Sequence, residues 1–116
     1  MRYAIFLTAL LAGTAANADA LDVVDSKSNF VQIVKGKDLT RMGMTLQVTE
    51  NGQITGRAFG KDVSGEWRWQ DGYFCRSLYW GSRDLGDNCQ QVAIDDGDIR
   101  FTSDRGKGQH ANFDLR

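Results

Sequence analysis

Apolar and polar residues alternate along most of the chain after position 43. This period of two is typical of β-strands that bury one face. The runs that we interpret as strands are 44–48, 53–59, 63–69, 73–80, 88–95, 99–103 and 109–115. The dipeptides that separate three pairs of these runs are Asn51-Gly52, Asp71-Gly72 and Asp96-Gly97. Such dipeptides favour hairpins, because both central positions of the tightest hairpin turn take positive φ.

The connections between these runs decide the fold class. Parallel strands need a crossover of about a dozen residues or more, and no segment between the runs is long enough. The sequence therefore predicts a mainly β fold, an antiparallel meander of seven or eight strands. Such a meander avoids exposed edges best when it forms a small barrel or a strongly curled sheet.

One short helix is predicted before the meander. Ser26 or Ser28 can cap its start, and Gly36 supplies its stop. The apolar residues that share one face at helical spacing are Phe30, Ile33 and Val34. A strand over 30–34 stays open as the alternative, because the run is short and β-branched.

The turn lengths predict the register of the hairpins. A two-residue turn at 71–72 pairs Trp69 with Phe74 and Trp67 with Arg76, and a turn at 96–97 pairs Ile94 with Ile99. The first hairpin fits a tight turn less well, because that turn separates the apolar residues of its two strands. A longer loop with a bulge turns the apolar positions of 53–59 inward, and we favour it.

The first twenty residues differ from the rest of the chain. Arg2 is followed by an apolar run over 4–12 and by two Ala-x-Ala sites that end at Ala18 and Ala20. This is the pattern of a secretory signal peptide, and the run is too short to span a bilayer. We therefore predict a signal peptide over 1–20 and a single β domain over 21–116, periplasmic or secreted and without a membrane span in its mature form.

Export changes the interpretation of the two cysteines. Cys75 and Cys89 are the only pair, and a disulfide is the usual state of such a pair in an oxidising compartment. A loop over 81–86 would bring them directly opposite each other on neighbouring strands. A redox or metal site is the alternative, but the spacing is not Cys-x-x-Cys and the sole histidine, His110, is distant in sequence.

Length and charge exclude several classes of protein. The chain has 116 residues, 14 Lys and Arg, 15 Asp and Glu, and a formal net charge of −1. This length predicts one domain, which excludes separate cofactor and substrate lobes. The near-neutral charge argues against a nucleic-acid partner, since such proteins need a basic surface.

Arg76 is the main candidate for chemistry. Alternation places it on the same face as Trp67, Trp69 and Trp80, where a guanidinium can stack on rings and bind a small anion. The alternatives are an internal ion pair of Arg76 with Glu66 or a loop aspartate, or a place at the barrel rim. For the tryptophans, the alternative is that they fill the core.

Three further motifs carry weaker signals. The acidic segment 95–98 lacks the spacing of a Ca²⁺ loop, and the glycines of 106–111 lack the strand and helix of a dinucleotide site. His110 lies near Ser103 and Asp104 in sequence, but no nucleophile elbow accompanies them. We therefore expect no catalytic residue, no metal site and no cofactor.

Three segments also carry a resemblance. They are Gly65-Glu66-Trp67-Arg68-Trp69-Gln70-Asp71-Gly72-Tyr73-Phe74-Cys75-Arg76, Asn88-Cys89-Gln90 and Phe101-Thr102-Ser103-Asp104-Arg105-Gly106. Together they resemble a group of small exported bacterial proteins often labelled dihydrodipicolinate reductase. That label implies a cytoplasmic NAD(P)H enzyme with a Rossmann domain. The chain departs from it in length, signal peptide and β pattern, so no residue role is carried over and the label is expected not to describe this chain.

Two main hypotheses follow. A non-enzymatic periplasmic binding or accessory module predicts an open barrel mouth in which Arg76 has no ion-pair partner. A protein–protein module, such as an inhibitor of an exported hydrolase, predicts a filled barrel and an exposed apolar or loop patch. A reductase, the third and least favoured hypothesis, predicts NADPH-dependent turnover.

Overall fold

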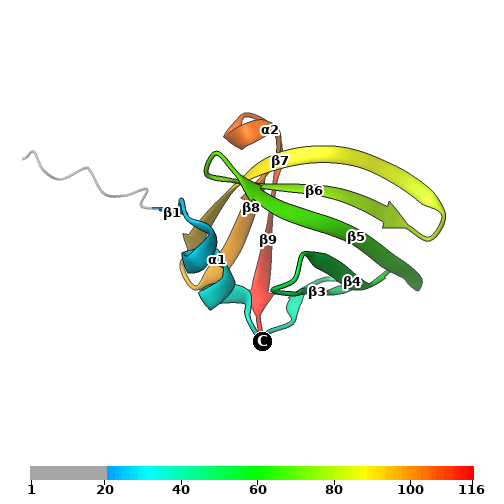
Figure 1. Cartoon of the computed structure of the whole chain (residues 1–116). Coiled ribbons are helices and arrows are strands. Elements are labelled where there is room, and N and C mark those ends of the chain that lie inside the picture. Colours follow the sequence, from blue (N-terminus) through cyan, green and yellow to red (C-terminus); the bar gives the residue numbers. More distant parts are fainter. Residues whose placement is uncertain (1–20) are drawn as a thin grey trace, which may run out of the picture.

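The computed structural model describes residues 21–116, so the predicted signal peptide over 1–20 lies outside the described residues. The described part contains nine strands and two short helices (Figure 1). The elements are β1 (Asp22–Val24), α1 (Lys27–Val34), β2 (Leu39–Arg41), β3 (Met44–Val48), β4 (Gln53–Ala58), β5 (Lys61–Gln70), β6 (Tyr73–Trp80), β7 (Arg83–Asp95), β8 (Asp98–Thr102), α2 (Ser103–Gly106) and β9 (His110–Leu115).

Strands β2 to β9 form a closed antiparallel barrel of eight strands. β7 closes it, because its first part pairs with β6 and its second part pairs with β8. β1 is an extra strand that pairs with β7 from Val24 opposite Val92 to Asp22 opposite Ile94. The prediction of a mainly β antiparallel barrel preceded by one helix is confirmed.

Two strands were absent from the sequence prediction. β1 and β2 have three residues each, which is too short for an alternating pattern to be recognised. Both exist because a longer strand supplies their hydrogen-bonding partner. β2 pairs with β3 on one edge and with β9 on the other, so it links the two ends of the meander.

The hairpin registers follow the turn dipeptides. Asp71 and Gly72 have φ of 55° and 85°, and the turn pairs Trp69 with Phe74 and Trp67 with Arg76, as predicted. The 96–97 turn likewise pairs Ile94 with Ile99. Asp and Gly are the residues that tolerate these left-handed conformations, so the turns define the register of the strands on either side.

The first hairpin has the longer loop. The amide of Thr49 donates to the carbonyl of Gln53 at 2.9 Å, which leaves three residues in the loop. Val48 consequently lies opposite Ile54, and Ile54 and Ala58 are buried. The expectation that the apolar positions of this return strand face inward is confirmed.

The connection between β6 and β7 corrects one prediction. Instead of a loop over 81–86, the structure has a tight turn after Trp80 and resumes pairing at Arg83. A register shift at Leu85 then brings Cys75 opposite Cys89, and the two form a disulfide. The residues of 83–87 are exposed and show no alternation, so only their backbone bonds to β6 make them a strand.

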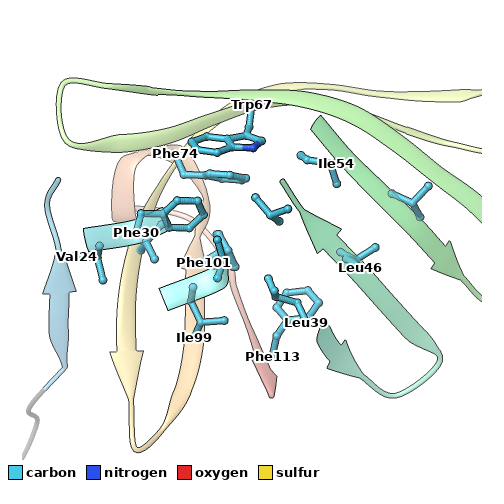
Figure 2. Packing of buried hydrophobic residues seen from close by; sticks show 14 of the residues in the cluster. Val24, Phe30, Leu39, Leu46, Ile54, Trp67, Phe74, Ile99, Phe101 and Phe113 are labelled. Atoms are coloured by element: carbon cyan, nitrogen blue, oxygen red, sulfur yellow. The ribbon is translucent and has the colours of Figure 1, made fainter. Parts of the chain in front are cut away.

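Helix α1 closes one end of the barrel with Phe30, which is fully buried. Its ring centroid lies 5.2 Å from that of Trp67 and 5.1 Å from that of Phe74 (Figure 2). The centroid of Trp69 is also 5.2 Å away. Ser26 caps the helix by accepting from the amide of Asn29 at 3.2 Å. The helix prediction is confirmed, and the alternative of a strand over 30–34 is wrong.

Removing the disulfide is expected to destabilise the barrel. Replacing Cys75 and Cys89 by Ala frees the unfolded chain, and a loop of about fifteen residues predicts a loss of about 3 kcal/mol in the free energy of unfolding. Urea titration of the oxidised protein and the double variant measures this loss. Reductant is expected to lower the free energy of unfolding of the parent and to leave that of the variant unchanged. An equal effect on both proteins would contradict a structural role of the disulfide.

Carboxylates gather at the 96–97 turn, and Asp98 is the one most affected. The pKa of Asp98 is raised above its ordinary 3.8, mainly by desolvation. The charge and hydrogen bond of Asp114 contribute next, followed by the charges of Asp95 and Asp96. Because the folded state holds the proton more tightly, stability rises as pH falls through the window just above that value. The repulsion is fully present at neutral pH.

Asp98→Asn is therefore expected to raise the melting temperature at neutral pH and to flatten its pH dependence in mild acid. Thermal unfolding followed by circular dichroism at a series of pH values measures both. Asp71→Asn changes an aspartate in another hairpin turn and serves as the control. A melting temperature lowered equally at all pH values would contradict the repulsion.

Candidate functional site

A cavity of about 440 Å³ occupies the barrel on the side away from α1. Its wall is mainly apolar. The apolar lining residues are Leu39, Met44, Leu46, Val48, Ile54, Phe74, Leu78, Phe101, Ala111 and Phe113. The polar lining residues are Arg41, Arg76, Gln90, Ser103, Gln109 and His110. No lining residue is a carboxylate, so the charged groups of the wall are cations.

Strand pairing explains where the cavity reaches the surface. β9 pairs with β2 only at Leu115 and Asp114, opposite Leu39 and Thr40. Residues 110–113 have no β2 partner on that edge. Arg41 lies at the end of β2, and Gln109 and His110 lie at the start of β9, so these three residues line the part of the cavity where the two strands diverge.

The opposite end of the cavity is closed by aromatic packing. Phe74 and Phe101 line it, and their ring centroids lie 5.1 Å apart. Behind them, Phe30 of α1 contacts both rings. The sequence therefore builds an apolar floor from one helix and two strands. Gln90 lies beside this floor, opposite Phe74, whereas Arg41, Gln109 and His110 lie at the opening.

Arg76 projects from β6 into this cavity. Its register partners are Trp67 on β5 and Asn88 on β7. Its Nη1 donates to the carbonyl of Gly86 at 2.9 Å. Among residues 21–116 it makes no ion pair, with Glu66 or with any loop aspartate.

The electrostatics of Arg76 follow from this position. Desolvation lowers the pKa of the Arg76 guanidinium, and the charge of Asp87 offsets only part of this effect. A guanidinium carries five N–H donors, and the bond to Gly86 uses one. The remaining donors bond to no residue of 21–116 and are available to an anion.

The three tryptophans do not line the cavity. Trp67 is buried, and its Nε1 donates to the carbonyl of Thr49 at 2.9 Å. Trp69 stacks on Phe30, outside the cavity wall. The structure thus places Arg76 alone, of the four predicted ligand-binding residues, in the cavity, while Trp67 and Trp69 fill the core.

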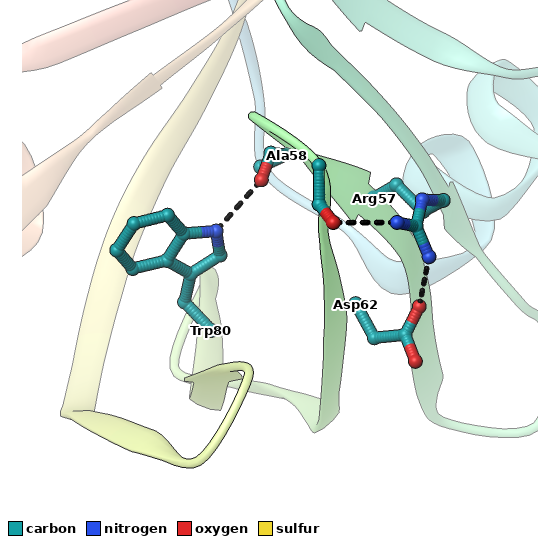
Figure 3. A network of polar contacts seen from close by, with 5 residues as sticks. Arg57, Ala58, Asp62 and Trp80 are labelled. Atoms are coloured by element: carbon teal, nitrogen blue, oxygen red, sulfur yellow. Dashed lines mark hydrogen bonds and ion pairs between the residues drawn. The ribbon is translucent and has the colours of Figure 1, made fainter.

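Trp80 joins neighbouring strands instead (Figure 3). Its Nε1 donates to the carbonyl of Ala58 at 2.7 Å, and the ammonium of Lys61 lies 4.6 Å from its ring centroid. Next to the β4–β5 turn, Arg57 of β4 forms an ion pair with Asp62 of β5 at 2.6 Å. These contacts hold β4, β5 and β6 together near the end of the barrel.

Gln90 and Ser103 are cavity residues that sequence reasoning missed. Gln90 is buried opposite Phe74, and its Nε2 donates to Ser103 Oγ at 3.2 Å. A polar residue at an inward position of β7 was the signal that could have found it. Ser103 became a neighbour only through the pairing of β7 with β8.

The weaker motifs form no site. The segment 95–98 is a hairpin turn, and 106–109 follows the left-handed residues Asp104 and Arg105. His110 is exposed on β9, and Ser103 is bonded to Gln90, so no triad is assembled. Within 21–116 no three His, Cys, Asp or Glu side chains gather as a metal site requires.

Comparison with known proteins adds no assignment. No family model, no curated protein and no solved structure matches this chain. Neither of the helices described for 21–116 is long and apolar enough to cross a membrane.

Replacing Arg76 separates a structural from a functional role. Removing one member of a buried ion pair lowers the free energy of unfolding by about 3–5 kcal/mol, because the other charge is left unpaired. Arg76 has no such partner, so Arg76→Met is expected to change the free energy of unfolding by less than about 1 kcal/mol. Urea unfolding measures this, and a loss in the larger range would show that the barrel depends on Arg76.

Proposed function

We propose that the protein is an exported, non-enzymatic binding module that holds a small amphiphilic anion in its barrel. Arg76 binds the anionic group, and the apolar wall receives the rest of the ligand. The observation that carries the proposal is a half-buried guanidinium that has no ion-pair partner among residues 21–116 and lines a cavity of about 440 Å³.

Size and polarity support this class of ligand. Binding sites for small molecules typically measure about 300–1,000 Å³ and are mostly apolar with a few polar groups. The cavity has this composition: Arg76 lines it, and Gln90 and Ser103, which are hydrogen-bonded to each other, form a polar strip. Because no lining group is an acid, a cationic ligand would find no counter-charge inside.

The energetics favour an anion. A desolvated guanidinium costs free energy when the cavity holds no anion, and a hydrogen bond to a charged group contributes about 1.5–3 kcal/mol. Binding would thus recover the cost of burying Arg76. The disulfide between Cys75 and Cys89 is compatible with the oxidising compartment that this proposal includes.

A matched pair of ligands tests the role of Arg76. Dodecanoate and dodecanol share one apolar chain and differ in charge. Isothermal titration of the delipidated, oxidised protein is expected to favour dodecanoate by at least about tenfold, which corresponds to about 1.4 kcal/mol. Arg76→Met is expected to abolish this preference while retaining the affinity for dodecanol.

Two controls locate the ligand. Arg68→Met removes an outward arginine, bonded to Gln70 at 2.8 Å, and is expected to leave both affinities unchanged. Ala111→Phe places a larger side chain in the cavity and is expected to lower the affinity for both ligands equally. Failure of the folded protein to bind either ligand, or an unchanged preference in Arg76→Met, would overturn the proposal.

A further inference from the structure

Two large apolar side chains project from adjacent hairpin turns into solvent. Met42, in the β2–β3 turn, is 89% exposed, and Phe59, in the β4–β5 turn, is 67% exposed. The two turns are joined by a backbone bond from the amide of Phe59 to the carbonyl of Gly43 at 2.8 Å. The ring of Phe59 covers Gly43 of the β2–β3 turn, but both side chains leave most of their surface in solvent, where it is available to a contact outside the barrel.

The backbone of Phe59 strengthens this observation. Its φ is 49°, in the left-handed region that bulky residues rarely adopt. Glycine or asparagine would occupy this turn position at lower cost. The contact with Gly43 holds the ring against the β2–β3 turn in spite of this backbone strain, with most of the ring surface exposed.

A third turn extends the same end of the barrel. The amide of Gly81 donates to the carbonyl of Asp62 at 2.7 Å, so the β6–β7 turn lies beside the β4–β5 turn. Beyond it, Leu85 is 45% exposed at the register shift. We call Met42, Phe59 and Leu85 the apolar tips.

Cations accompany these tips. Arg41 precedes Met42, Lys61 follows the Phe59 turn, and Arg83 follows the third turn. Within 21–116 none of these three makes an ion pair. Asp62, next to Lys61, is paired with Arg57, whereas Asp84 and Asp87 lie on either side of Leu85. The excess of cations is therefore beside Met42 and Phe59.

We propose that the apolar tips bind the surface of an anionic phospholipid bilayer. Separate convex tips insert into a deformable interface more readily than into the shaped surface of a protein, and flanking Arg and Lys side chains pair with anionic headgroups. The apolar groups enter the boundary between headgroups and acyl chains. This inference does not depend on what the cavity holds.

Vesicle flotation tests the proposal. The mature protein is mixed with vesicles of phosphatidylglycerol and phosphatidylcholine, or of phosphatidylcholine alone. Binding is expected only to the anionic vesicles and is expected to weaken at high salt. The double variant Met42→Ser, Phe59→Asn is expected to bind at least about tenfold less, because it removes both insertions while asparagine tolerates the turn conformation.

Two controls make the result specific. Val23→Ser changes a 53% exposed apolar residue of β1, outside the turns that carry the apolar tips, and is expected to bind as the parent does. Arg76→Met is also expected to retain vesicle binding, which separates this surface from the cavity. Phe59→Trp supplies a direct readout, since insertion shifts the emission of its indole to the blue.

Two outcomes would overturn the proposal. The first is equal binding of the parent and the double variant to anionic vesicles, or no binding by either. The second is a concentration-dependent dimer in sedimentation that the double variant abolishes, because the tips would then contact a second copy of the chain.

Discussion

β7 changes its partners along its length, and this change closes the barrel. Its first part bonds to β6, and from Val92 onward it lies between β8 and β1. Closure removes the open edges that a meander of eight strands would otherwise expose. It also brings residues of β2, β6, β7 and β9 around one cavity, although they are far apart in the sequence. The disulfide joins β6 and β7 just before the change, where β7 is bonded to β6 but not yet to β8 or β1.

The two ends of the barrel are packed differently. At one end, Phe30 of α1 fills the interior against Trp67 and Phe74 (Figure 2), and against Trp69. At the other end the strands diverge, and of the helices described for 21–116 only α2 reaches the cavity wall, through Ser103. The interior there remains open, and a guanidinium is held at its wall by a single backbone carbonyl. A domain of this size has little stability to spare, so an unfilled cavity and a desolvated charge are features that folding alone does not favour.

The local pattern predicted the candidate site in part. Alternation from Phe74 to Trp80 placed Arg76 inside the barrel, because residues two apart share a face. The same rule placed the tryptophans on inward faces but not their depth along the barrel axis. Depth depends on the stagger between strands and on where α1 packs. For that reason Trp67 and Trp69 belong to the packed end, whereas Arg76 faces the cavity.

The sequence by itself determined the strand class, the hairpin registers at 71–72 and 96–97, the helix over 27–34 and the pairing of Cys75 with Cys89. These features depend on residues close together in the chain, whose turn conformations and periodicity are local properties. Only the tertiary structure decided the short strands β1 and β2, the polar strip of Gln90 and Ser103, and the alignment of the exposed tips Met42 and Phe59. Each of these depends on pairing between distant strands, for which local composition carries no signal.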